Sequence, residues 1–394
     1  MLNTGFSPWP NFSPEEIDAA VAVLASNGVN YWTGNVCREF EREFAAWVGS
    51  EYAVALANGT LALDVAMKAL DIGPGDEVVV TSRTFLASAS SIVLAGAVPV
   101  FADVDAESQN ITAETISAVL TEKTKAILCV HLAGWPCDMD PIMQLARERG
   151  LSVIEDCAQA HGAYYKGRSV GTIGDVGAWS FCQDKIMSTG GEGGMVTTSR
   201  RDLWARMWSY KDHGKNWEAV YERKHPPGFR WVHESFGTNW RMLELQAAIG
   251  RIQLQRLPDW HRSRQENALR LAETLAACEV VRVPWPGADV SHAWYKFYAF
   301  IKPEALASGW SRDRVMAEIN AAGVPCYAGS CSEVYLEKAF DGTGWRPRER
   351  LPVARTLGET SLMWLVHPSL SEAEMYRMAE VSRHVLLQAG RNAS

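Results

Sequence analysis

Short apolar runs alternate with amphipathic stretches through the first half of the chain. The runs are rich in valine and isoleucine, and the stretches between them have helical spacing. Apolar runs separated by helices are typical of parallel strands that are covered on both faces. We expect strands at 52–57, 77–82, 98–104, 125–132 and 151–157, and helices at 60–70, 85–96, 112–120 and 139–150. The pattern predicts an α/β fold, with a large domain built on a mostly parallel, seven-stranded type of sheet between helices.

The segments on either side of this alternation are mainly helical. A helix is predicted from Pro14 to Asn27, because Ser13 is a favourable N-cap and proline suits the first helical position. Further helices are expected at 35–49, 200–212, 241–278, 311–323 and 371–388, and further strands at 176–181, 195–199 and 292–303. The last part of the chain fits a smaller C-terminal α+β lobe. We expect one domain over 1–257 and a second over 258–394.

Composition and charge exclude several classes of protein. Hydrophobic residues make up 47% and charged residues 21%, an ordinary globular balance, and the net charge of −8 argues against a broad nucleic-acid surface. The eight cysteines form no CxxC pair, so neither a metal site nor a disulfide framework is expected. The chain has no signal-peptide pattern and no apolar run of about 20 residues, the length of a membrane span. We expect a cytoplasmic protein that binds neither nucleic acid nor membrane.

Polar residues gather where the predicted strands end. Asp156 ends an apolar strand and is followed by Gln159 and His161. In open α/β sheets, ligands bind at the carboxyl ends of the strands. A carboxylate there is costly unless a cation accepts it, so Asp156 is either a permanent partner of a protonated ring nitrogen or metal, or a structural helix cap or ion pair.

Two further positions carry candidate chemistry. Gly59 and Thr60 open a helix directly after a strand, where backbone amides can bind a phosphate, although Asn58 or Thr60 as a plain N-cap would look the same. Lys185 lies between a strand and the loop "GGEGG", where partial desolvation would make its amine a nucleophile toward a carbonyl. Taken alone, Lys185 would be interpreted as an ordinary surface cation, as most lysines are. The glycines are not a dinucleotide fingerprint, because a strand and not a helix follows them.

Together these groups are suited to one cofactor. Pyridoxal phosphate needs a lysine for a Schiff base, an acid facing its pyridinium nitrogen and a phosphate site. Lys185, Asp156 and the Gly59 turn meet those needs, and Phe85 is an aromatic candidate for the ring face.

At this point the chain resembles the DegT/DnrJ/EryC1/StrS family of sugar aminotransferases, within the fold-type I pyridoxal-phosphate enzymes that share the aspartate aminotransferase-like fold. The resemblance extends over about residues 30–257 and is carried by "ANGTLAL", "GPGDEVVVTSRTFLASASSIVLAGAVPVFADV", "VHLAGWPCDMDPI", "VIEDCAQAHGAYYKGRSVGTIGDVGAWSF" and "TNWRMLELQAAIGRIQL". The segment "SLMWLVHPSLSEAEM" resembles the family's C-terminal lobe.

The resemblance implies a role for each matching residue. Lys185 would form the Schiff base and Asp156 would face the pyridinium nitrogen. Gln159 would bind the ring hydroxyl and Phe85 would stack on the ring. The phosphate would be bound by Gly59, Thr60 and Ser180, and by Asn239 from a neighbouring subunit, which implies a homodimer with shared active sites.

The resemblance also implies the reaction. An amino donor, glutamate in this family, would pass its amino group through the cofactor to the keto group of a nucleotide-diphosphate-linked keto-deoxysugar. Candidate substrate residues are His161, His213, Arg230 and Trp231, the last two in an aromatic and basic loop at 214–236. The nucleotide, the sugar and the carbon that is aminated stay open, since the family's His-rich "HY.PLH" segment is replaced here by "VPCYAGSCSEVYLEKAF".

Three alternatives remain at this point. A dehydratase or a cyclitol aminotransferase of the same family would keep the cofactor, although the sugar 3-dehydratases replace the lysine with histidine. A non-catalytic regulator on this fold is the alternative of another class, and both Lys185 and Asp156 argue against it. A dinucleotide-dependent dehydrogenase would need a glycine fingerprint that the sequence lacks.

Overall fold

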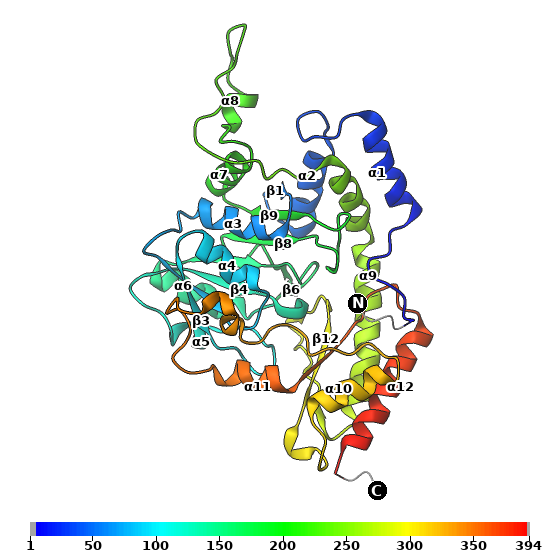
Figure 1. The fold of residues 1–394 in the computed structure, drawn as a ribbon. Helices are drawn as coiled ribbons and strands as arrows, with labels where there is room; N and C mark the ends of the chain where they lie inside the picture. Colours follow the sequence, from blue (N-terminus) through cyan, green and yellow to red (C-terminus); the bar gives the residue numbers. More distant parts are fainter. Residues whose placement is uncertain (1–4, 392–394) are drawn as a thin grey trace.

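A seven-stranded sheet forms the centre of the large lobe (Figure 1). The computed structural model describes residues 5–391. The strands, in sheet order, are β1 (Tyr52–Leu56), β9 (Gly194–Thr198), β8 (Val176–Ser180), β5 (Ser152–Asp156), β4 (Thr124–Val130), β2 (Glu77–Thr81) and β3 (Val98–Ala102). β9 runs antiparallel to both β1 and β8, and the neighbouring strands from β8 to β3 are parallel. The predicted α/β fold with a large, mostly parallel sheet is confirmed.

Helices cover both faces of this sheet, because successive strand side chains point to opposite faces. Val78 and Val80 pack in one buried cluster with α3 and α4, whereas Val79 between them packs in another cluster with α5 and α6. The helices of this lobe are α2 (Val36–Val48), α3 (Gly59–Ala69), α4 (Leu86–Leu94), α5 (Ala113–Ser117), α6 (Met139–Arg149) and α7 (Arg201–Lys211). Two-sided burial explains why the strands read as continuous apolar runs.

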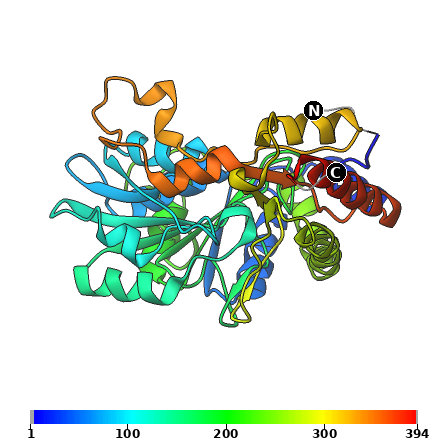
Figure 2. The same ribbon diagram turned by 90° about the horizontal axis from the view of Figure 1, so that it is seen from below.

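A 33-residue helix, α9 (Glu244–Ala276), connects the two lobes and contacts helices from both. α1 (Pro14–Ser26) and α2 pack against it, and so does α12 (Glu372–Ala389) of the smaller lobe. Figure 2 shows α9 nearly end-on, between the sheet and the helices of the smaller lobe. The expected boundary between 257 and 258 falls inside this helix, and the division into two domains stays a prediction.

The smaller lobe has its own three-stranded sheet and its own apolar core. Its elements are β10 (Val281–Arg282), β12 (Phe297–Ile301), β13 (Ser361–Trp364), α10 (Arg312–Ala321), α11 (Pro352–Thr360) and α12. A further small sheet consists of β6 (Tyr164–Tyr165), β7 (Arg168–Ser169) and β11 (Val290–Ser291), and 3₁₀ turns occupy Leu132–Gly134, Pro303–Ala305, Val334–Leu336 and Lys338–Phe340.

The loop at 214–236 projects from the body as an arm that contains α8 (Trp217–Tyr221) (Figure 1). The arm carries large apolar side chains in solvent, with Trp231 at 81% and Phe236 at 99% exposure. Among residues 5–391, no helix combines the length and the apolar character that crossing a bilayer requires.

Candidate active site

The parallel strands direct their carboxyl ends toward a cavity of about 820 Å³. Its lining includes three of the predicted cofactor residues, namely Phe85, Gln159 and Lys185. The smaller lobe contributes a second wall, which includes Tyr295 just before β12 and Tyr298 within it. The cavity therefore lies between the smaller lobe and the sheet edge at which the sequence places its polar residues.

Lys185 lies in the loop after β8, with 16% of its side chain exposed. Its Nζ atom is 3.7 Å from an oxygen of Asp184 and 5.2 Å from the centroid of the Tyr295 ring. Its backbone carbonyl accepts a hydrogen bond of 2.7 Å from the indole of Trp9. The lysine is thus held in the cavity wall and is not a freely solvated surface cation.

Asp156 ends β5 and is almost completely buried. One carboxylate oxygen accepts a 2.8 Å hydrogen bond from the Ser88 hydroxyl, and the other accepts a 3.1 Å bond from the Ala158 amide. The Ser88 hydroxyl is also 2.8 Å from that of Thr84, which lines the cavity. Burial raises the pKa of Asp156, while the two hydrogen bonds and the charge of Lys185 oppose this effect. A positively charged ring nitrogen would stabilise the ionised form of such a buried carboxylate.

The Gly59 turn meets the end of β8 in a close approach. α3 begins at Gly59, and Asn58 caps it by accepting a 3.0 Å hydrogen bond from the Leu61 amide. A Cβ atom on Gly59 would lie 2.4 Å from the Cβ of Ser180, so only glycine fits there. This approach brings the free amides of a helix N-terminus beside a hydroxyl, an arrangement that is suited to a phosphate.

Gln159 and Phe85 present groups to the cavity that a flat ring can use. The Gln159 side-chain oxygen accepts a 2.7 Å hydrogen bond from the Ala133 amide, which leaves the amide NH₂ as the group that it can offer to a ligand. Phe85 precedes α4 and is 70% exposed although it lies at the cavity. Together with Lys185, Asp156 and the Gly59 turn, these residues fit pyridoxal phosphate.

Comparisons with known proteins agree with this geometry. Residues 10–382 match the DegT/DnrJ/EryC1/StrS aminotransferase family. The chain belongs to this family. It is 37% identical to the GDP-perosamine synthase of Caulobacter vibrioides over 365 residues, which cover 90% of this chain and 92% of that one. It is 61% identical to an aminotransferase of Psychrobacter cryohalolentis, whose crystal structure matches with a TM-score of 0.96 over 98% of this chain and 99% of that one.

The prediction of an aminotransferase is confirmed by this membership. A Streptococcus pneumoniae structure solved in a PLP form is also similar, with 25% identity, a TM-score of 0.86 and 98% coverage of each chain. The family and this similarity imply pyridoxal phosphate as the cofactor, in agreement with the fit of the cavity residues.

The structure does not bring the predicted substrate residues together with Lys185 in one copy of this aminotransferase. Arg230 and Trp231 lie on the projecting arm, where Arg230 donates to the Val220 carbonyl. His213 and Asn239 are exposed near the base of the arm, and Asn239 pairs through its backbone with Asp212. None of these four lines the cavity with Lys185.

His161 lies in the core and not at the substrate opening, unlike the position expected from the sequence. Its ring is fully buried, with the rings of Trp179 and Phe181 each 5.5 Å away. Neither ring nitrogen has a hydrogen-bond partner in the described chain. Burial lowers the pKa of His161 to about 3, so the ring is neutral near pH 7. Packing against two aromatic side chains of the β8 region decides this position.

Acid should weaken the fold through this histidine. Because the folded pKa of about 3 lies below the ordinary value of 6.5, the unfolded chain binds the proton first as the pH falls. The stabilisation is therefore complete above pH 6.5 and is lost toward pH 3, by about 1.4 kcal/mol per pH unit. The free energy of unfolding, measured with urea between pH 6 and 4, should therefore change less steeply with pH in His161→Phe than in wild type, by this amount per pH unit. His233→Gln, in the exposed arm, is the control, and an unchanged slope in His161→Phe would contradict the expectation.

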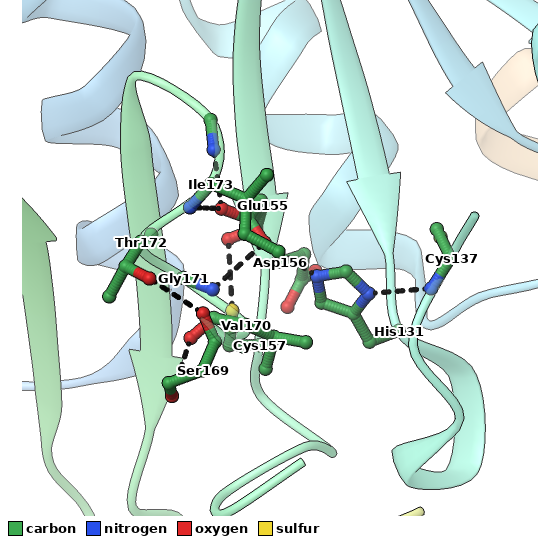
Figure 3. A network of polar contacts seen from close by, with 12 residues as sticks. His131, Cys137, Glu155, Asp156, Cys157, Ser169, Val170, Gly171, Thr172 and Ile173 are labelled. Atoms are coloured by element: carbon green, nitrogen blue, oxygen red, sulfur yellow. Dashed lines mark hydrogen bonds and ion pairs between the residues drawn. The ribbon is translucent and has the colours of Figure 1, made fainter. Parts of the chain in front are cut away.

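A buried polar network formed around His131 and Glu155 lies next to Asp156 (Figure 3). Glu155 accepts hydrogen bonds from the amides of Gly171, Ile173 and Gly174 at 2.8, 2.7 and 2.7 Å. His131 Nδ1 accepts from the Cys137 amide, so its Nε2–H donates to Glu155 at 3.0 Å. Burial alone would raise the pKa of Glu155, but these donors hold it below its ordinary value.

This network is structural. His131, Glu155 and Cys157 lie close enough to suit a metal ion, but both ring nitrogens and both carboxylate oxygens are already engaged by protein groups. The network fixes the 171–174 loop to β5 one residue before Asp156, and so fixes the strand end that carries this carboxylate.

Replacing Glu155 by glutamine should destabilise the fold by about 2 kcal/mol, since an amide NH₂ would face donors that now bond to a carboxylate oxygen. Urea unfolding at pH 7 measures this change. The exposed Glu148→Gln variant is the control, and equal stabilities of the two variants would show that the network contributes little.

Several cavity residues carried no recognisable pattern in the sequence. Trp9, Arg264 and Tyr295 come from three distant segments and meet only in the folded chain. Asp184 had one signal in the sequence, because it directly precedes Lys185.

Proposed function

We propose that this chain transfers an amino group from L-glutamate to the keto group of a nucleotide-diphosphate-linked keto-deoxysugar, with pyridoxal phosphate as cofactor. The single observation that carries the proposal is the position of Lys185 in the wall of a cavity that Phe85 and Gln159 also line, close enough to the buried Asp156 for its charge to lower the pKa of that carboxyl. The name GDP-perosamine synthase of the Caulobacter relative supports a nucleotide sugar as the acceptor.

The proposed roles of the cofactor residues follow from their contacts. Bound pyridoxal phosphate supplies a carbonyl for amines and a ring that withdraws electrons from the substrate. Lys185 Nζ forms the covalent link, and Asp156 keeps the ring nitrogen protonated. Gln159 donates its NH₂ to the ring hydroxyl, and Phe85 stacks on the ring. The phosphate lies against the amides of Gly59 and Thr60 and the hydroxyl of Ser180.

Lys185 also moves the proton in this proposal. With the cofactor and the amino donor bound, the free Nζ of Lys185 would act as the general base that removes the substrate's proton and then as the general acid that returns it. Its surroundings suit this role. The Asp184 carboxylate stabilises the positive charge of the protonated amine on one side, and the Tyr295 ring shields the amine from water on the other.

The arm fits a role in a homodimer with shared active sites. Exposed aromatic side chains such as Trp231 and Phe236 are unfavourable in a free monomer and mark an interaction surface. We propose that the arm reaches the cavity of the partner subunit, where Arg230, Trp231 and His213 contact the nucleotide sugar and Asn239 contacts the phosphate.

The visible spectrum of the purified protein with added pyridoxal phosphate tests the proposal. We expect an absorbance band of the lysine-linked cofactor, its loss on addition of L-glutamate, and its return with a UDP-, GDP- or dTDP-linked 3-keto or 4-keto sugar. Sedimentation should give the mass of two chains. A protein that shows no band at saturating cofactor would overturn the proposed function.

A further inference from the structure

One wall of the cavity is formed by α9 and by the residues just before β12. This wall carries two cations in addition to Lys185. Arg264, on α9, is 1% exposed, and its Nη1 donates to the carbonyls of Trp294 and Tyr295 at 3.2 and 3.4 Å. Its Nε has no hydrogen-bond partner, and within residues 5–391 it forms no ion pair with a carboxylate. The guanidinium thus lies at the cavity without a counter-charge.

Lys296 lines the same cavity and is also without an ion-pair partner among the residues that the structure describes. Its Nζ lies 4.5 Å from the centroid of the Tyr295 ring, the ring that Lys185 Nζ approaches to 5.2 Å. Burial lowers the pKa of Lys296 to about 8 and that of Arg264 to about 9. Asp184, the carboxylate of this wall, is already hydrogen-bonded by the Tyr295 hydroxyl and lies near Lys185.

Buried cations without a partner are costly, and an anionic ligand removes that cost. A guanidinium binds a carboxylate through two parallel hydrogen bonds, and a nearby ammonium adds charge. The wall therefore has the donors of a carboxylate site, and it adjoins the reacting amine.

We propose that Arg264 and Lys296 form the subsite that binds the α-carboxylate of the amino donor. This inference rests on the proposed function. An α-amino acid holds its carboxylate carbon two bonds from its amino nitrogen, so its anion must lie beside Lys185. The diphosphate of a nucleotide sugar is separated from the aminated carbon by part of the sugar ring, and so lies farther from Lys185.

The test uses the cofactor-loaded protein and the variants Arg264→Gln and Lys296→Gln. Matched controls are Arg270→Gln, a half-buried arginine on the same helix that pairs with Glu372, and Lys302→Gln, just after β12. The lysine-linked absorbance band should form in all four. The L-glutamate concentration that gives the half-maximal rate of band loss should rise about 10- to 100-fold in the first two, the effect of losing one charged hydrogen bond, and stay unchanged in the controls.

A donor series separates this role from a general defect. L-isoglutamine has an amide in place of the α-carboxylate and keeps the other carboxylate. Wild-type protein should respond to it about 10- to 100-fold more weakly than to L-glutamate, and the two variants should no longer distinguish the two donors. If the two variants distinguish L-glutamate from L-isoglutamine as strongly as wild type does, the proposed α-carboxylate subsite is wrong.

Binding of UDP, GDP and dTDP tests the competing assignment, in which Arg264 and Lys296 hold the diphosphate of the nucleotide sugar. Variants that respond normally to L-glutamate but lose affinity for these nucleotides would show that the two cations hold a diphosphate, and would overturn the proposal. If Arg264→Gln does not fold, Lys296→Gln decides alone, because its side chain makes no hydrogen bond in the described chain. A missing band in wild-type protein would instead refute the proposed function.

Discussion

Replacing Lys185 by alanine should lower turnover by about 10⁴-fold or more, because general acid–base catalysis alone contributes 10²–10⁴ and the covalent link is lost as well. The lysine-linked absorbance band should be absent even with saturating pyridoxal phosphate. Single-turnover measurements with L-glutamate report the change in rate, and the spectrum reports the change in linkage.

The fold should tolerate this substitution. Apart from Asp184 at 3.7 Å, the Lys185 side chain forms no ion pair in residues 5–391, so unfolding by urea should be near that of wild type. Lys166→Ala, in an exposed pair with Asp140, is the matched control and should keep full activity. A Lys185→Ala protein that turns over within tenfold of wild type would remove this residue from its proposed role.

Replacing Asp156 by asparagine should lower turnover by about 10²- to 10³-fold, the usual effect of removing one preorganised electrostatic group. The amide has nearly the same shape as the carboxylate but no charge, so it cannot keep a ring nitrogen protonated. It also turns an NH₂ toward either Ser88 or Ala158, each of which now donates to a carboxylate oxygen.

Two readouts distinguish this effect from a packing defect. The band of the lysine-linked cofactor should still form in Asp156→Asn, since Lys185 is intact, but its removal by L-glutamate should be slow. The exposed Asp71→Asn variant is the control. A fast response to L-glutamate in Asp156→Asn would show that the carboxylate does not face the ring nitrogen.

The catalytic side of the cavity could be predicted from the sequence because its residues follow strand ends. Asp156 directly ends β5, Gly59 starts the helix after β1, and Lys185 follows β8. Strand order in a parallel sheet then places these short segments at one edge. The network around Glu155 was not predictable to the same degree, since its donors come from a loop with no periodic pattern.

His161 marks the limit of such reasoning. Two residues after Gln159 in the sequence, it belongs to the core, because Trp179 and Phe181 enclose its ring. A polar residue near a strand end can therefore point into the cavity or into the core. The local sequence does not decide between them, since the choice depends on which distant side chains fill the space.

The α/β fold and the family could be read from the amino-acid sequence alone, and so could the sheet edge at which the candidate cofactor residues gather. These properties depend on short-range spacing of apolar, glycine and strand-end residues. The folded chain was needed to show that Arg264 and Lys296 line one cavity with Lys185, and that the arm leaves Trp231 in solvent. The C-terminal half of α9 packs within the smaller lobe against the residues just before β12, and this wall faces Lys185 of the large lobe. That packing between distant segments determines which cations are left without a partner at the cavity.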